Sequence, residues 1–285
     1  MKLADLIPWN DRAGRFSTLH AAAFAAAVAP AGWLAVAFAA GWLTADPLKD
    51  ATLLTGTWTL YFLLASLAVT PLKGLLGWPR LVALRRLLGV TAFAYAASHL
   101  LLYVLYQDVD LAKVAGEIAS RIYLTIGFAT VTGLALLAAT SFDAAMRRLR
   151  RNWKRLHRLA YPLAALGLLH FYMQSKSDVS APVLLSGLFV ALMLHRLTPR
   201  LTRRAASPAA VVAVAVAAGL AAAGFEYAWY AAASGLPAGR VLLSNLDFSY
   251  QVRPMWIVMA LAALPAVVML ARRLAPELRR SVPAE

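Results

Sequence analysis

Two apolar stretches, 87-LLGVTAFAYAASHLLLYVLY-106 and 156-LHRLAYPLAALGLLHFY-172, decide the fold of this chain. The first holds His99 near its middle, and the second holds His157 at its start and His170 near its end. An ionisable side chain within a membrane span is costly and indicates a functional site. Paired imidazoles at one depth on facing helices are what a haem with two axial histidines needs. The pattern therefore predicts a cofactor site between membrane helices.

The composition is that of a membrane protein. Of the 285 residues, 61% are hydrophobic and 14% are charged, whereas soluble domains have about half apolar and a quarter charged residues. The net charge is +15, but the basic residues lie between apolar runs, so we expect contacts with membrane lipid and no nucleic-acid partner. The absence of cysteine excludes iron–sulfur clusters and covalently attached c-type haem. Any haem must be bound non-covalently.

Eight apolar runs approach the length needed to cross about 30 Å of hydrocarbon as helices. The fifth and sixth are short, and the fifth borrows flanking residues before it. We interpret the first as a retained span and not as a signal peptide, because it lacks a clear small-residue cleavage site. The runs are Leu19–Leu43, Leu53–Leu72, Leu87–Gln107, Tyr123–Phe142, Leu159–Met173, Pro182–Leu197, Pro208–Ala233 and Met255–Ala271.

The distribution of Lys and Arg predicts the orientation. The segments on the N-terminal side of the membrane hold 22 of these residues, and the opposite side holds six. The positive-inside rule then puts both termini in the cytoplasm.

Depth along the helices separates the histidines. At 1.5 Å per residue, His99 and His170 each lie about 18–20 Å from the cytoplasmic side, so they share a level in the outer half of the membrane. His157 lies at the cytoplasmic edge, where it is a candidate ligand of a second haem. On an ideal helix His157 and His170 point about 140° apart, and Pro162 between them predicts a kink. For each histidine taken alone, a packed, hydrogen-bonded side chain is the competing interpretation.

Three further residues are candidates on the cytoplasmic side. Arg85 and Arg86 suit haem propionates or a flavin phosphate, because guanidinium groups bind such anions in a bidentate manner. Anchoring by the positive-inside rule is the alternative, and we favour it. His20 lies at the right height to assist a cytoplasmic-side site.

Four segments resemble the MsrQ family, also called YedZ, and the resemblance covers roughly residues 15–200. MsrQ is similar in turn to the ferric-reductase-like transmembrane domain. The segments are ADPLKDATLLTGTWTLYFLLASLAVTPL from Ala45, RRLLGVTAFAYAASHLLLYVL from Arg85, SRIYLTIGFATVTGLALLAATS from Ser120 and WKRLHRLAYPLAALGLLHFYMQSK from Trp153.

This resemblance implies a haem-binding membrane subunit of a bacterial methionine sulfoxide reductase system, in the inner membrane of the cell, which the chain crosses several times. His99, His157 and His170 match the family's haem-associated histidines, and His20 falls on a family histidine. The family implies one or two b-type haems that pass electrons to MsrP, a periplasmic molybdopterin enzyme that repairs oxidised proteins. It also implies an association with FMN, and a flavin reductase or the quinone pool as electron donor. The substrate chemistry is then expected in the partner and not in this chain.

The predicted fold class is all-α, a polytopic membrane helical bundle with both termini cytoplasmic. A cytoplasmic segment (1–18) precedes a six-helix ferric-reductase-like haem core (19–204). An additional two-helix C-terminal hairpin (205–274) and a cytoplasmic tail (275–285) follow, and the family implies no role for them. We expect Glu226, the acid well within the hairpin, to reach the aqueous edge by snorkelling.

Two other functions remain open from the sequence. A ferric or cupric reductase would use the same haem core with another acceptor, and a transporter or proton channel would use the histidines as a proton relay. A nicotinamide domain is not expected, because no glycine-rich GxGxxG segment follows a predicted strand.

Overall fold

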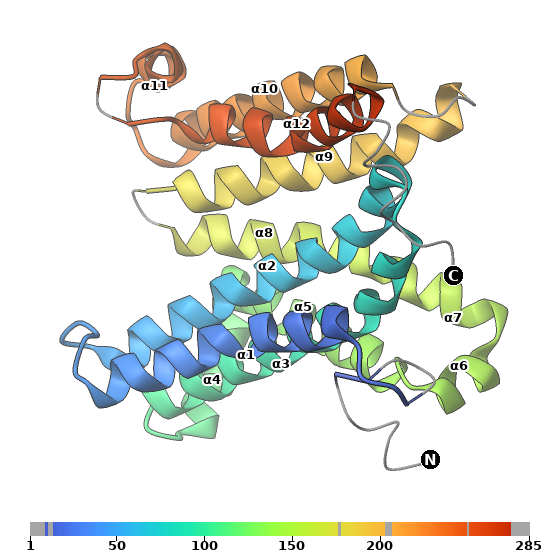
Figure 1. Cartoon of the computed structure of the whole chain (residues 1–285). Coiled ribbons are helices and arrows are strands. Elements are labelled where there is room, and N and C mark those ends of the chain that lie inside the picture. Colours follow the sequence, from blue (N-terminus) through green and yellow to red (C-terminus); the bar gives the residue numbers. More distant parts are fainter. Residues whose placement is uncertain (1–8, 11–13, 176–177, 203–206, 250, 275–285) are drawn as a thin grey trace. The chain divides into compact units, whose positions relative to one another are not determined.

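A computed structural model describes residues 9–10, 14–175, 178–202, 207–249 and 251–274 (Figure 1). The described residues are helical and include no β-strand, which confirms the all-α class. The predicted tail 275–285 and most of the first 13 residues lie outside the described residues. The helices are α1 (Thr18–Ala39), α2 (Pro47–Leu76), α3 (Leu84–Tyr106), α4 (Leu111–Ser120), α5 (Ile122–Ala139), α6 (Asp143–Leu149), α7 (Arg151–Leu156), α8 (Ala160–Gln174), α9 (Ser180–Thr202), α10 (Pro208–Ala233), α11 (Ala238–Leu243) and α12 (Pro254–Leu274), with 3₁₀ turns η2 (Pro79–Ala83), η3 (His157–Leu159) and η4 (Ser244–Leu246).

Seven helices among the described residues are long and apolar enough to cross a membrane. They correspond to all the predicted spans except the fifth. That span is α8, which has 15 residues and follows the 3₁₀ turn η3. Pro162 therefore lies in the first turn of α8, where a missing N–H is tolerated. We expected a kink in one continuous helix between His157 and His170, but the chain instead changes from a 3₁₀ turn to an α-helix before Pro162.

The chain divides into two compact units. The first comprises Met1–Ser66 and Ala83–Gln174, and the second comprises Leu67–Val82 and Ser175–Glu285. In the first unit α5 packs against both α3 and α8, and in the second α9, α10 and α12 pack against one another (Figure 1). Helix α9, which we predicted to close the haem core, thus packs with the C-terminal hairpin. The predicted boundary between the haem core (19–204) and the C-terminal hairpin (205–274) stays a prediction.

Two long helices contain a proline, and near each proline a polar side chain forms hydrogen bonds with backbone groups of the helix. In α1, near Pro30, the Tyr95 hydroxyl donates to the Ala27 carbonyl at 2.9 Å and accepts from the Ala31 N–H at 3.0 Å. In α2, Pro71 cannot donate to the carbonyl of Leu67, and the Arg196 guanidinium donates to it instead. Both insertions satisfy backbone groups for which the hydrocarbon offers no partner.

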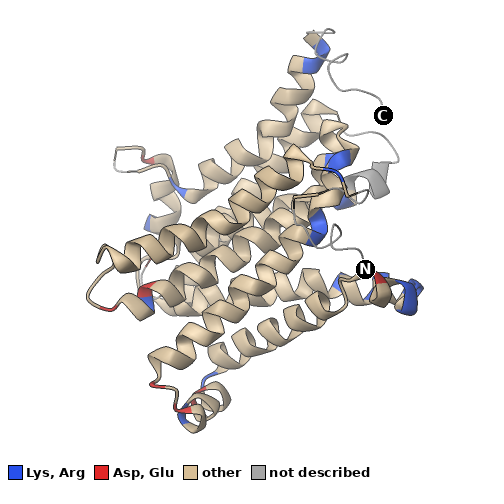
Figure 2. Ribbon diagram, turned by 60° about the horizontal axis from the view of Figure 1, so that its bottom comes forward, with Lys and Arg blue, Asp and Glu red and all other residues tan. Residues whose placement is uncertain are grey.

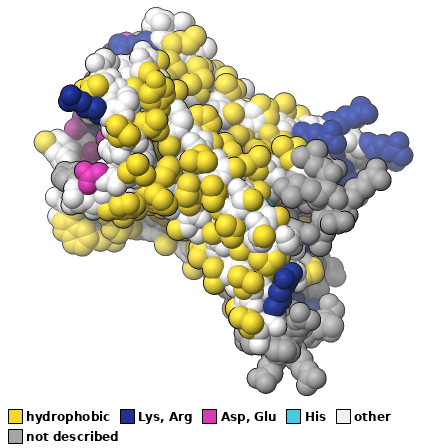
Figure 3. Space-filling model, turned by 90° about the horizontal axis from the view of Figure 1, so that it is seen from above, with side chains coloured by type: hydrophobic (Ala, Val, Ile, Leu, Met, Phe, Trp, Pro, Cys, Tyr) yellow, Lys and Arg dark blue, Asp and Glu magenta, His cyan; other side chains and the backbone are white. Residues whose placement is uncertain are grey.

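Charged residues lie mainly at the helix ends, and the helix middles are nearly free of them (Figure 2). Hydrophobic side chains cover most of the face shown in Figure 3. Large apolar side chains are exposed along the spans, as in α1, where Trp33, Val36 and Phe38 are each more than half exposed. A helix with outward-facing apolar residues of this kind is suited to lipid.

The expectation for Glu226 was wrong. Its side chain does not reach the aqueous edge: the residue is 1% exposed, and its Oε1 accepts from Arg253 Nη2 at 2.6 Å. The sequence interpretation missed this because Arg253 lies 27 residues later, beyond the loop that joins the two helices of the hairpin. The chain folds back so that the start of α12 meets α10, and the acid is paired there.

Candidate functional site

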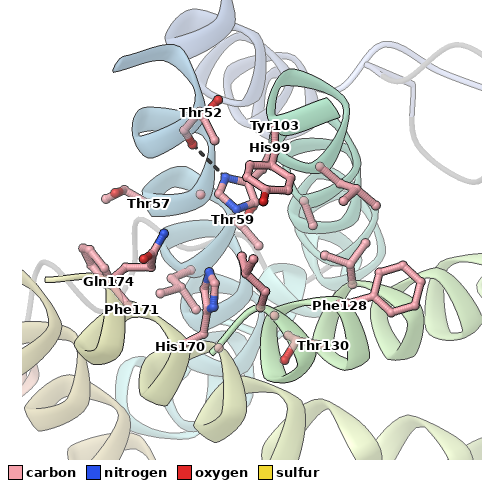
Figure 4. A pocket seen from close by; sticks show the side chains of 18 of the residues that line it. Thr52, Thr57, Thr59, His99, Tyr103, Phe128, Thr130, His170, Phe171 and Gln174 are labelled. Carbon is pink, nitrogen blue, oxygen red and sulfur yellow. Dashed lines mark hydrogen bonds between the residues drawn. The ribbon is translucent and has the colours of Figure 1, made fainter. Parts of the chain in front are cut away.

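The first unit contains a cavity between α2, α3, α5 and α8 (Figure 4). Its unfilled space is about 1040 Å³, the open mouth included. The lining is mainly aliphatic and aromatic. It comprises Thr52, Leu53, Gly56, Thr57, Thr59, Leu60, Leu63, Ala96, His99, Leu100, Tyr103, Ile118, Leu124, Gly127, Phe128, Thr130, Val131, Leu134, Gly167, His170, Phe171 and Gln174.

His99 from α3 and His170 from α8 face each other in this cavity (Figure 4). Their ring centroids are 6.1 Å apart, and the ring planes are nearly perpendicular, at 82°. Two imidazoles that share one metal at about 2 Å from each nitrogen have ring centroids about 6 Å apart. The separation therefore fits one iron between the two rings.

Both rings carry their proton on the nitrogen that faces away from the cavity. Nδ1 of His99 lies 2.7 Å from the Thr52 carbonyl, and Nδ1 of His170 lies 2.8 Å from the Tyr123 carbonyl. A carbonyl oxygen only accepts, so each Nδ1 is the donor, and in the neutral imidazole Nε2 then keeps its lone pair. A second partner of this kind fixes the tautomer and orientation of a metal-ligating histidine.

The rest of the lining offers few competing polar groups. The hydroxyls of Thr52, Thr59 and Thr130 donate to carbonyls one turn earlier in their own helices. Apart from Tyr103 and Gln174, the lining therefore presents mainly apolar groups around the two imidazole rings. Such an environment favours a large flat cofactor bound by axial coordination over a hydrated ion.

His157 lies in a different setting at the other end of α5. Its ring stacks on Trp153 with centroids 4.1 Å apart, and its Nε2 is 3.2 Å from the Thr140 hydroxyl. Trp153 Nε1 in turn donates to the Thr140 carbonyl at 2.8 Å. No second imidazole faces His157 among the described residues, and no cluster of three or more metal-binding side chains occurs there.

The other predicted residues do not line the cavity. Arg86 forms an exposed ion pair with Asp143 at 3.0 Å, and its role stays a prediction. Arg85 contributes its carbonyl to a hydrogen bond from Ser66. His20 lies in the first turn of α1, where its Nδ1 is 3.0 Å from the hydroxyl of the capping residue Ser17.

The sequence interpretation missed Gly56 and Gly127, against which the two rings pack. A signal for them existed. Each histidine follows its carbonyl partner by 47 residues, so one offset aligns His99 with His170, Gly56 with Gly127 and Thr59 with Thr130. Hydropathy alone cannot reveal such a repeat, because most of its positions are interchangeable apolar residues.

Comparison with known proteins identifies the family of the chain. The family described as ferric reductase like transmembrane component matches residues 54–168. The protein-methionine-sulfoxide reductase heme-binding subunit MsrQ of Rhodospirillum rubrum is 41% identical over 192 residues, which is 67% of this chain and 90% of the relative. MsrQ of Xanthomonas euvesicatoria pv. vesicatoria is 42% identical over 179 residues, which is 59% of this chain and 81% of the relative. No solved structure matches the chain.

Proposed function

Because the chain belongs to the MsrQ family, the haem-binding subunits of protein-methionine-sulfoxide reductase, we propose that it carries electrons across the bacterial inner membrane through a b-type haem bound by His99 and His170. The acceptor is MsrP, the periplasmic molybdopterin reductase. One observation carries the ligand assignment. Two imidazoles, each donating through Nδ1 to a backbone carbonyl, face each other at 6.1 Å across an apolar cavity.

The residues of the chain bind and orient the cofactor. A haem with two axial imidazoles supplies one-electron transfer and leaves no open coordination position for oxygen. His99 and His170 would hold the iron from two helices, the carbonyls of Thr52 and Tyr123 would keep a proton on each Nδ1 so that Nε2 of the neutral ring is the ligand, and the aliphatic part of the lining would exclude water. The substrate chemistry then belongs to the partner.

The structure supports one haem more strongly than two. His157 already interacts with Trp153 and Thr140, and a haem there would have to displace the Thr140 contact. We keep His157 as the candidate ligand of a second haem, with His20, Arg85 and Arg86 as neighbours for a propionate or an FMN phosphate. The donor, a flavin reductase or the quinone pool, acts on this cytoplasmic side.

The orientation has independent support. The excess of Lys and Arg on one side, 22 against six, favours cytoplasmic termini. His99 and His170 then lie in the outer half of the membrane, toward the acceptor.

The test is the visible spectrum of the purified protein. Wild type should show Soret and alpha bands that change on reduction, and His99→Ala or His170→Ala should each abolish the same haem. Full haem content in either variant would exclude the paired ligation. A folded but colourless wild-type protein would favour the transporter alternative.

The acceptor is tested by reconstitution. Reduced protein in proteoliposomes should be reoxidised by purified MsrP with methionine sulfoxide, and not by MsrP without that substrate. Rapid reoxidation by ferric or cupric complexes, with none by MsrP, would favour the metalloreductase alternative.

A further inference from the structure

The same two backbone features fix each pocket imidazole. His99 donates to the Thr52 carbonyl of α2, and Gly56 lies one turn further along that helix. His170 donates to the Tyr123 carbonyl of α5, and Gly127 lies one turn further along α5. Each ring therefore lies between a carbonyl and a glycine on a helix other than its own.

The glycines leave no space for a side chain. A Cβ on Gly56 would lie 2.9 Å from Nδ1 of His99, and a Cβ on Gly127 would lie 2.8 Å from both Nδ1 and Cε1 of His170. Contacts this short do not occur for real Cβ atoms, so any side chain would push the ring. The ring cannot retreat without stretching its hydrogen bond to the carbonyl one turn earlier.

We propose that Gly56 and Gly127 are positioning residues that set the plane and the depth of the two axial imidazoles. The inference rests on the proposed function, in which these rings bind the haem iron. Each ring plane is fixed by its own neighbouring helix, independently of the other ring and of the cofactor. The two rings held in this way lie at 82° to each other.

The proposal has a spectroscopic consequence. Ferric haem with nearly perpendicular axial imidazoles gives a strongly anisotropic low-spin electron paramagnetic resonance (EPR) signal with a large highest g value, whereas parallel rings give a more rhombic signal. Wild-type protein should give the strongly anisotropic signal.

The experiment compares Gly56→Ala and Gly127→Ala with Gly32→Ala in the full-length haem protein. Gly32 lies inside α1, and a Cβ there meets no atom within 4 Å, so this variant controls for the change of residue type. Alanine is the better helix former at all three positions, so loss of helix propensity cannot explain a defect. We expect each pocket variant to lose at least half its haem or to shift its highest g value and midpoint potential, while Gly32→Ala matches wild type.

A second pair of variants tests the proposal even if Gly56→Ala folds poorly. In His99→Gly, free imidazole supplies a ligand that is not tethered to α3 and is able to move away from an added Cβ. His99→Gly and the double variant His99→Gly/Gly56→Ala should therefore recover the same haem absorbance at the same imidazole concentration. Weaker recovery in the double variant would show that Gly56 acts on something other than the tethered ring, which would overturn the proposal.

The proposal would also be overturned if Gly56→Ala and Gly127→Ala both had the haem content, g values and midpoint potential of the wild type. That result would leave ligation by His99 and His170 intact, because ligation is tested by replacing the histidines themselves.

Discussion

Both units of the chain bury ionisable side chains, which face a cavity in the first unit and bind other protein groups in the second. In the first unit, each imidazole of the cavity binds one carbonyl and turns its other nitrogen toward open space. In the second unit, Glu226 pairs with Arg253, and Asn245 Nδ2 lies 3.4 Å from its other oxygen. A polar atom that faces a cavity marks a binding site, and a polar atom that binds protein groups marks a structural contact.

Removing Arg253 should have the largest effect on stability. Arg253→Ala would leave the Glu226 carboxylate buried without its cation, and breaking a buried pair in this way costs about 3–5 kcal/mol. We expect a large drop in the unfolding temperature in detergent, measured by circular dichroism, with normal haem content in the protein that remains folded. Loss of haem at full stability would show that the pair serves the cofactor. Glu117→Gln, which removes a more exposed ion pair with Arg121, should change stability little.

Replacing both partners should cost less than replacing one. In Glu226→Leu/Arg253→Leu no uncompensated charge remains, and apolar replacement of a buried pair is often neutral or stabilising. We expect the double variant to unfold above Arg253→Ala in the same assay. If it instead unfolds below that variant, the pair contributes specific contacts that apolar packing cannot replace.

His157 tests the comparison inside the first unit. With Trp153 and Thr140 as its partners, His157→Ala should leave the haem of the cavity intact. Stability should fall by about 0.5–1.5 kcal/mol for the lost ring contact. The haem-to-protein ratio from a pyridine haemochrome assay, together with an unfolding curve, measures both. A halved ratio would assign a second haem to His157.

The smallest effect concerns pH and Asp178, which precedes α9. Hydrogen bonds from Ser180, including its N–H at 2.9 Å, lower the pKa of Asp178 below its ordinary value of about 3.9. A lowered folded pKa stabilises the protein above the unfolded pKa, and this stabilisation is lost as the pH falls through the folded value. Asp178→Asn should therefore flatten the decline of stability between about pH 5 and pH 3 slightly. An identical decline in the variant would assign it to other carboxyl groups.

Much of the fold was predictable because it depends on local composition. Seven of the eight predicted apolar runs correspond to helices with the length and hydropathy of a membrane span. The fifth run, which was predicted to be short, corresponds to α8, and its 15 residues fall below the length of the other spans. Hydropathy works here because hydrocarbon leaves the backbone no partner outside its own helix. The counts of Lys and Arg also predict cytoplasmic termini, and this orientation stays a prediction.

The site was predictable in part. Counting residues at a fixed rise was enough to bring His99 and His170 to one level. The ideal-helix count does not apply between His157 and His170, because His157 lies in the 3₁₀ turn η3 that precedes α8. Nothing local indicated that Glu226 would meet Arg253, since the loop between them determines where α12 begins.

The order of apolar and basic segments by itself determined that this chain is a helical membrane protein with paired histidines, since span length and hydration cost depend on residue type alone. The approach of the helices decided the rest. Tautomer, ring plane and the space for a cofactor depend on a carbonyl and a glycine from another helix. Only the packed structure brings each carbonyl within 3 Å of its ring and leaves no room for a Cβ at each glycine.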